Sequence, residues 1–227
     1  MIEDTLIKYM TSRLEKETPT EKEVGPVITL SREYGCYASH IATLLNERLT
    51  ESSKKVKWTV ISNEILQEAA KSLEVNPEKI SHLFGANEKQ FLGDLVESFS
   101  SKKYVSDSSI KRAITAIVSS HAEQGNVIIV GRAGCVITKG IAKSLHVRIN
   151  APLDWRIRRI QERFSISEAA AKKQVADIDE KRNLFMSFFH GDKPETELFD
   201  MIFNRGKMSE DEIVNSIFNI ALSRHFI

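Results

Sequence analysis

Residues 127–131 read Val-Ile-Ile-Val-Gly and carry the clearest strand signal in this 227-residue chain. Four consecutive apolar residues are typical of a strand that is buried on both faces, as in a parallel sheet covered by helices. The glycine directly after the run marks the turn at which such a strand would end. These residues therefore indicate an α/β protein with a parallel sheet.

Further apolar runs on both sides of this stretch have the length of short strands. They lie at residues 27–30, 58–61, 146–149 and 201–203. Apolar residues with helical spacing follow the first run, at Ile41, Leu45 and Leu49. Strands that alternate with helices predict a predominantly parallel sheet with helices on both faces, and ligands bind at the carboxyl edge of such sheets.

Helix starts and domain limits follow from polar patterning. Serine followed three positions later by glutamate predicts two capping boxes, Ser165 with Glu168 and Ser209 with Glu212. Residues 1–24 are expected to form an N-terminal helix and a solvated linker, because helical spacing there gives way to the unpatterned stretch EKETPTEKE. Residues 25–227 are then expected to form one α/β domain, with a helical insertion at 76–104.

The composition is that of an ordinary soluble globular protein, with 41% hydrophobic and 28% charged residues. The net charge of +1 disfavours a chain that wraps nucleic acid, yet it is compatible with a local site for a small anion. No apolar stretch approaches the roughly 20 residues that span a bilayer. The N-terminus also lacks a secretory apolar core. Together with only two cysteines, Cys36 and Cys135, these features predict a cytoplasmic protein without membrane association.

The first loop to consider follows the run at 27–30 and reads Ser-Arg-Glu-Tyr-Gly-Cys-Tyr-Ala-Ser-His at residues 31–40. Backbone amides at the start of a helix bind phosphate well, so this strand-to-helix loop is a candidate phosphate site. The full motif GxxxxGK[ST] is absent, because only Gly35 remains and no lysine follows it. A plain turn in which Gly35 supplies a positive φ is the alternative.

A second candidate loop directly follows the strand at 127–130. It contains Gly131, Arg132 and Gly134, and glycines beside an arginine suit the close approach of an anion. A tight turn with a surface arginine is the equally open alternative.

An arginine-rich helix is predicted after residue 152. Its apolar face would consist of Leu153, Ile157, Ile160 and Phe164. Arg156, Arg159 and Arg163 have the spacing of a separate basic stripe, suited to phosphate oxygens or simply to solvent.

The next helix has an arginine where an apolar residue is expected. Its apolar stripe comprises Ala171, Val175, Ile178, Phe185 and Phe189, and Arg182 falls on the same stripe. A half-buried arginine needs a partner, which would be Asp179 one turn earlier or a ligand phosphate. The six histidines have no metal-ligand spacing, so no protein metal site is predicted.

Several of these segments together resemble the cytidylate kinase-like family, a branch of the P-loop nucleoside monophosphate kinases. The segments are VITLSREYG (27–35), IIVGRAGCVI (128–137), INAPLDWRIRRIQERFSIS (149–167), DIDEKR (177–182) with FFHG (188–191), and FDMIFNRGKMS (199–209). The resemblance implies a P-loop NTPase-like three-layer α/β fold with a five-stranded, mainly parallel sheet and a helical lid region at 152–192. It also implies phosphoryl transfer from ATP, with Mg2+, to a nucleoside monophosphate such as CMP.

The resemblance also implies roles for individual residues. Phosphate or nucleotide contacts would come from Arg32, Gly35, Ser39, Gly131, Arg132 and Arg163. The arginines that act on the transferred phosphate would be Arg132, Arg156, Arg159 and Arg182. Arg132 is similar to the family's arginine that reads the acceptor nucleotide.

Three departures from the family's pattern leave a second function open. Residues 36–39 read Cys-Tyr-Ala-Ser in place of a glycine-rich segment, Ala133 replaces an aspartate, and Ser62-Asn63 end the second strand without the usual aspartate. Side chains at Tyr37 and Ala38 would crowd a backbone that wraps phosphate closely. The alternative to a kinase is therefore a non-catalytic descendant that senses nucleotides or binds another protein, and homo-oligomers are compatible with either.

Overall fold

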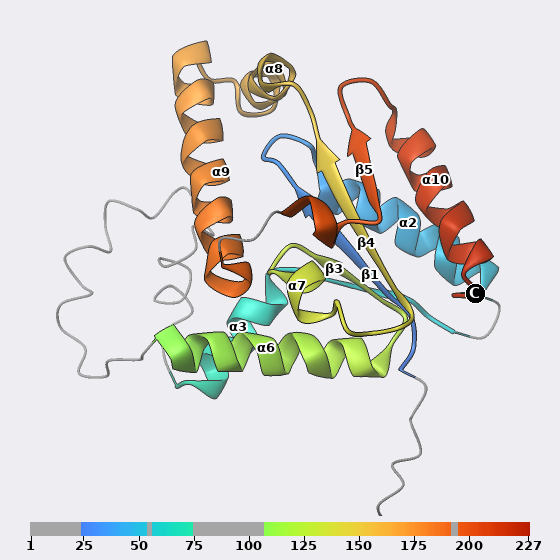
Figure 1. The fold of residues 1–227 in the computed structure, drawn as a ribbon. Coiled ribbons are helices and arrows are strands. Elements are labelled where there is room, and N and C mark those ends of the chain that lie inside the picture. The colour runs from blue at the N-terminus through green and yellow to red at the C-terminus, as the bar shows by residue number, and fades with distance from the viewer. Residues whose placement is uncertain (1–23, 54–55, 75–106, 192–194) are drawn as a thin grey trace, which may run out of the picture.

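The computed structural model describes residues 24–53, 56–74, 107–191 and 195–227, in which strands and helices alternate (Figure 1). The strands are β1 (Val27–Arg32), β2 (Thr59–Ile61), β3 (Val127–Val130), β4 (Ser144–Asn150) and β5 (Met201–Asn204). The helices are α2 (Ala38–Ser52), α3 (Glu64–Ser72), α6 (Asp107–Gln124), α7 (Gly134–Ile137), α8 (Leu153–Phe164), α9 (Glu168–His190), the short 3-10 helix η1 (Glu195–Leu198) and α10 (Glu210–Ser223). The predicted N-terminal helix and the predicted insertion at 76–104 lie outside the described residues.

The strands form one sheet in the order β2-β3-β1-β4-β5, and each neighbouring pair is parallel. β1 is central, with Val27 opposite Val127 of β3 on one side and Ser144 of β4 on the other. All carboxyl ends therefore meet at one edge of the sheet, as the α/β prediction requires. The predicted parallel five-stranded sheet is confirmed.

Alternate residues of the strands pack on opposite faces of the sheet, which makes three layers. Ile28 and Leu30 of β1 share a buried cluster with residues of α2 and α10, including Leu45 and Ile217. Val27 belongs to the other cluster, with residues of α3 and α6. Because both faces are covered, β3 is buried at every position, and this explains its unbroken apolar sequence.

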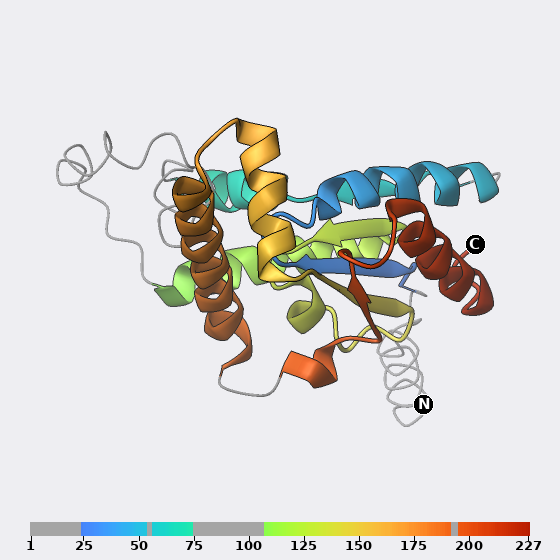
Figure 2. The same cartoon turned by 90° about the horizontal axis from the view of Figure 1, so that it is seen from above.

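The helices α8 and α9 lie side by side at the carboxyl ends of the strands (Figures 1 and 2). They share a separate buried cluster of Ile157, Ile160, Ala171 and Val175. Tyr34, from the loop after β1, packs partly buried against this cluster. The lid region therefore rests on the first candidate loop.

The expected apolar face of α8 is shorter than its periodicity predicts. Ile157 and Ile160 are buried, whereas Leu153 and Phe164 at the helix ends are 46% and 45% exposed. This part of the prediction is wrong, because only the middle of the expected apolar face, Ile157 and Ile160, belongs to the cluster that α8 shares with α9.

One of the two predicted capping boxes is also wrong. Ser165 has φ 52° and ends α8 in the left-handed conformation, which does not suit the start of a helix. Ser167 caps α9 instead, and its hydroxyl accepts a hydrogen bond from the Ala170 amide. The Ser209–Glu212 capping box is confirmed at the start of α10.

Both cysteines, Cys36 and Cys135, are buried free thiols. In the part of the chain that the structure describes, no helix has the length and apolar character to cross a membrane.

Candidate functional site

Three arginines meet at the carboxyl edge of the sheet. Arg32 is the last residue of β1, Arg132 lies two residues beyond β3, and Arg182 comes from α9. Burial lowers the pKa of Arg32 well below its usual value, and the positive charges of Arg182 and Arg132 lower it further. Burial, with the charge of Arg182, likewise lowers the pKa of Arg132 to about 10. The three side chains thus concentrate positive charge at a poorly hydrated place, where an anion would be strongly attracted.

A conformationally unusual turn shapes this cluster. Gly131, Arg132 and Ala133 all have positive φ angles, of 76°, 55° and 52°. The guanidinium of Arg32 occupies the space that a β-carbon at Gly131 would need. Positive φ at non-glycine residues costs on the order of 1 kcal/mol each and is concentrated at functional sites. The conformation of this turn therefore explains the glycine at position 131, and the turn brings Arg132 close to Arg32.

Arg132 is held only in part by protein groups. Its Nη2 donates a hydrogen bond to Oδ1 of Asn63, after β2, at 2.7 Å. Its Nε is buried and has no hydrogen-bond partner among the described residues. A buried guanidinium with an unsatisfied N–H is suited to donate a hydrogen bond to a ligand oxygen, since leaving such a donor unpaired costs about 1–3 kcal/mol.

The loop after β1 turns sharply into α2. Gly35 has φ 91°, and a β-carbon there would lie 3.1 Å from Cβ and 3.3 Å from the carbonyl oxygen of Arg156. Tyr37 precedes α2 with a left-handed φ of 52°. Burial, followed by the charge of Glu33, raises the pKa of the Cys36 thiol to about 12. Ser39 lies exposed in the first turn of α2.

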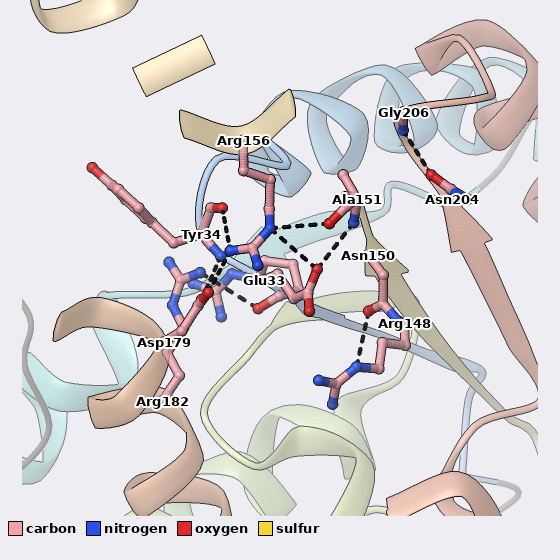
Figure 3. A network of polar contacts seen from close by, with 11 residues as sticks. Glu33, Tyr34, Arg148, Asn150, Ala151, Arg156, Asp179, Arg182, Asn204 and Gly206 are labelled. Atoms are coloured by element: carbon pink, nitrogen blue, oxygen red, sulfur yellow. Dashed lines mark hydrogen bonds and ion pairs between the residues drawn. The ribbon is translucent and has the colours of Figure 1, made fainter. Parts of the chain in front are cut away.

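Arg156 is buried in the centre of a polar network that ties the lid region to this loop (Figure 3). Its Nε lies 3.3 Å from Oε2 of Glu33 and donates to the carbonyl oxygen of Ala151 at 3.1 Å. Its Nη1 donates to the carbonyl oxygen of Tyr34 at 3.3 Å and forms an ion pair with Asp179. Arg156 therefore joins the ends of β1 and β4 to α8 and α9.

The two carboxylates of this network also bind backbone amides. Oδ1 of Asp179 accepts a hydrogen bond from the Tyr34 amide at 2.7 Å. Oε2 of Glu33 accepts one from the Ala151 amide at 3.0 Å. Each carboxylate is thus fixed by an arginine and by an N–H group, which are the two kinds of donor that also bind phosphate.

The predicted basic stripe of α8 is divided by this arrangement. Arg156 is buried, whereas Arg159 and Arg163 lie over the ring of Tyr37 at 5.5 and 4.7 Å from its centroid. The Tyr37 hydroxyl donates to the carbonyl oxygen of Arg159 at 3.0 Å. Arg182 donates to the carbonyl oxygen of Arg32 at 3.4 Å and lies over the ring of Tyr34.

The structure therefore brings the predicted residues into two neighbouring groups. Arg32, Gly131, Arg132 and Arg182 form the arginine cluster. The second group lies where the lid region covers the first loop and consists of Gly35, Arg156, Arg159 and Arg163. Ser39 lies apart from both groups, exposed in the first turn of α2. The roles of these residues toward phosphate stay predictions.

Glu33 and Asp179 have a larger part in the site than their positions in the sequence indicated. A single carboxylate within a loop forms no recognisable pattern in the sequence, so Glu33 was not predicted as a site residue. Asp179 was expected to be one of two partners for Arg182, and it forms an ion pair with Arg156. Within the described residues no group of three His, Cys, Asp or Glu side chains is arranged to hold a metal ion.

The model of the cytidylate kinase-like family matches residues 27–207. Cytidylate kinases from Ignicoccus hospitalis and Staphylothermus marinus are 29% and 30% identical over 112 and 113 residues. These matches cover 49% of this chain and 64% and 63% of the relatives, so the matched part is less than two thirds of their length. A uronate isomerase from Corynebacterium glutamicum is 28% identical over 112 residues, only 21% of its length.

Solved structures support the same fold. A structure of an uncharacterized protein from Eubacterium ventriosum has a TM-score of 0.62 and 21% identity, and the match covers 87% of this chain and 98% of that one. A shikimate kinase from Bacteroides thetaiotaomicron has a TM-score of 0.50 and 12% identity, with the same coverage. At these identities the likeness concerns the fold alone. The family match spans most of the chain, and this chain belongs to the cytidylate kinase-like family.

Proposed function

We propose that this protein is a nucleoside monophosphate kinase-like enzyme that transfers a phosphate from ATP to an acceptor such as CMP. The observation that carries the proposal is the convergence of Arg32, Arg132 and Arg182 at the carboxyl ends of β1 and β3. Ligands of open α/β folds bind at this edge of the sheet. The similarity to the two archaeal cytidylate kinases supports a nucleotide as the ligand.

Phosphoryl transfer depends on positioning and on neutralisation of charge, and arginines supply both. Even with its pKa lowered to about 10, Arg132 remains a cation at neutral pH. Its buried Nε would donate to a phosphate oxygen, and its Nη2 is already oriented by Asn63. Arg32 and Arg182 would neutralise the remaining charge of the transferred group.

Mg2+ would accompany ATP and would lower the charge of its phosphates. The described residues offer no cage of carboxylates for it, and Glu33 is already engaged by Arg156 and the Ala151 amide. Mg2+ commonly binds through substrate phosphates, water and one or two carboxylates, so this donor set is compatible with a metal delivered with the nucleotide.

The proposal is tested by calorimetry of ATP and CMP binding, with and without Mg2+, followed by a phosphorylation assay over the common nucleoside monophosphates. We expect binding of both ligands and turnover of at least one acceptor. Arg132→Gln should weaken acceptor binding at least tenfold, since charge-assisted hydrogen bonds contribute about 1.5–3 kcal/mol. If no nucleotide binds at millimolar concentration, the proposal is wrong.

A second candidate function is nucleotide sensing or protein interaction without catalysis. The observation that favours it is the first loop, in which the Tyr34 amide already binds the Asp179 carboxylate and Tyr37 lies beneath two lid arginines. Nucleotide binding without turnover of any acceptor would favour this function over the kinase.

A further inference from the structure

We infer that the Asp179 carboxylate is a built-in competitor of phosphate at the first loop, so that the lid region is held closed until an anion displaces it. This inference rests on the proposed function only for the nature of the ligand, a phosphate chain. It concerns how access to the loop is controlled. The observations that carry it are the contacts of Asp179 with Tyr34 and Arg156, together with the close packing of Arg156 on Gly35.

Asp179 uses the donors that a phosphate on this loop would use. One of its oxygens accepts a hydrogen bond from the Tyr34 amide at 2.7 Å, and the other forms the ion pair with Arg156 (Figure 3). A backbone N–H in the loop that leads into α2 and an arginine guanidinium are both characteristic phosphate donors. The Asp179 carboxylate therefore occupies the N–H donors of Tyr34 and Arg156 that a phosphate oxygen would otherwise accept from.

Helix α8 packs directly on the first loop at Gly35 and Tyr37. Arg156 lies so near Gly35 that a β-carbon there would be 3.1 Å from Cβ and 3.3 Å from the carbonyl oxygen of Arg156. The Tyr37 hydroxyl is bonded to the carbonyl oxygen of Arg159 at 3.0 Å. A phosphate that wraps against the Gly35 backbone would need this part of α8 to move away. Since Asp179 holds Arg156, its release and the movement of α8 are coupled.

The network is arranged so that it can open without leaving Arg156 unpaired. Oε2 of Glu33 lies 3.3 Å from Nε of Arg156, and the Ala151 carbonyl accepts from the same nitrogen. These partners belong to the ends of β1 and β4, not to α9. When Asp179 withdraws, Arg156 keeps one carboxylate, and an anion on the loop would become its second partner.

The test compares Asp179→Asn with Asp177→Asn in the full-length protein. Asp177 is exposed on the same helix two residues away, so its variant makes the same charge change without touching the loop. The probe is inorganic tripolyphosphate, measured by calorimetry. We expect Asp179→Asn to bind it about tenfold more tightly than the wild type, and Asp177→Asn to bind it no more than twofold more tightly. Equal affinities of all three proteins, or absence of binding to any, would overturn the inference.

A second measurement needs no substitution. Hydrogen exchange of residues 174–184 in α9 is compared in the wild type with and without tripolyphosphate. Displacement of Asp179 predicts faster exchange in this segment when the anion is bound. Slower or unchanged exchange with the anion bound would show that the contact persists, and would contradict the inference.

These experiments distinguish failure of the inference about Asp179 from failure of the proposed kinase function. Tighter tripolyphosphate binding by Asp179→Asn in a protein that phosphorylates no nucleotide would support the built-in competitor and reject the kinase. Nucleotide turnover by a wild type whose anion affinity is unaffected by Asp179→Asn would do the reverse.

Discussion

The guanidinium of Arg32 fills the space beside Gly131 that the side chain of any other residue would occupy. Arg32 ends β1 and Gly131 directly follows β3, so this contact joins the carboxyl ends of two strands that are distant in sequence. The absence of a side chain at Gly131 leaves space for the guanidinium. This relationship explains why the arginine cluster requires a residue without a side chain at position 131.

Gly131→Ala is therefore expected to disrupt the site more than the fold. Alanine at φ 76° costs about 1 kcal/mol, and the added methyl group would also push the Arg32 guanidinium out of place. We expect tripolyphosphate or ATP affinity to fall at least tenfold, as measured by calorimetry.

Gly191→Ala is the matched control. Gly191 has nearly the same φ, 71°, but no heavy atom lies within 4 Å of the place its β-carbon would take. Because its ψ of −159° places it in a region that few residues other than glycine adopt, this variant should lose at least as much stability in urea, yet it should retain its anion affinity. A similar loss of affinity in both variants would contradict the role assigned to the Gly131–Arg32 pair.

Arg132→Gln should stabilise the anion-free protein while weakening anion binding. Burial and the nearby charge of Arg182 already lower the pKa of Arg132 to about 10, which means that the folded state opposes this cation. Its removal should raise the free energy of unfolding by about 1 kcal/mol. Urea unfolding without and with 50 mM phosphate measures both effects.

The control for this variant is Arg158→Gln, which removes an exposed arginine from α8. It should change stability little and leave the response to phosphate intact. If Arg132→Gln destabilises the anion-free protein, the desolvation and repulsion inferred for the cluster are too small to matter.

Arg156→Met should be strongly destabilising. Removal of this arginine leaves Glu33 and Asp179 without their ion-pair partner, although their side chains keep 27% and 21% exposure. Breaking a buried pair costs about 3–5 kcal/mol, and the partial exposure places our expectation near 3 kcal/mol. The triple variant Glu33→Gln, Asp179→Asn, Arg156→Met should recover part of this loss in urea unfolding. Failure to recover any would show that packing of the arginine stem dominates.

His146 should make stability depend on pH. Burial lowers the pKa of His146. The negative charge of Asp200 opposes this shift, and the positive charge of Arg224 adds to it. Since the folded pKa lies below the unfolded value of about 6.5, the unfolded chain takes up the proton first as the pH falls. The contribution of neutral His146 is therefore complete above about pH 6.5 and is lost as the pH falls from there toward the lowered folded value.

The measurement is urea unfolding between pH 5 and 8 for the wild type and for His146→Gln. The variant should lose less stability than the wild type on acidification. His225→Asn, which changes an exposed histidine and keeps a residue that tolerates the positive φ at this position, should behave as the wild type. Parallel pH curves for wild type and His146→Gln would refute the prediction.

The fold was largely predictable because its strands are covered on both faces. The run Val127–Val130 coincides with β3, since burial on both sides leaves no polar position to obscure the pattern. Helix ends were less certain, and Ser165 shows why. Its spacing to Glu168 suits a cap, but Ser165 ends α8 in the left-handed conformation and Ser167 caps α9.

The candidate site was predictable in its residue types and not in its pairing. Periodicity grouped Arg156 with Arg159 and Arg163, because all three lie on one side of an isolated helix. Which arginine is buried depends on the carboxylates that other segments bring, and those of Glu33 and Asp179 come from the loop after β1 and from α9. Such contacts are decided by tertiary packing, which one helix's sequence does not contain.

The position of Arg156 also has a consequence for the order in which the chain folds. Its partners lie after β1, after β4 and in α9, so the guanidinium loses water without compensation until all of these segments have assembled. Contacts of such long sequence separation form slowly, because the intervening chain must first be closed into loops. The Glu33–Arg156 contact spans the chain about as widely as the pairing of β1 with β4, so we expect the loop–lid network to become native no earlier than the sheet on which it rests.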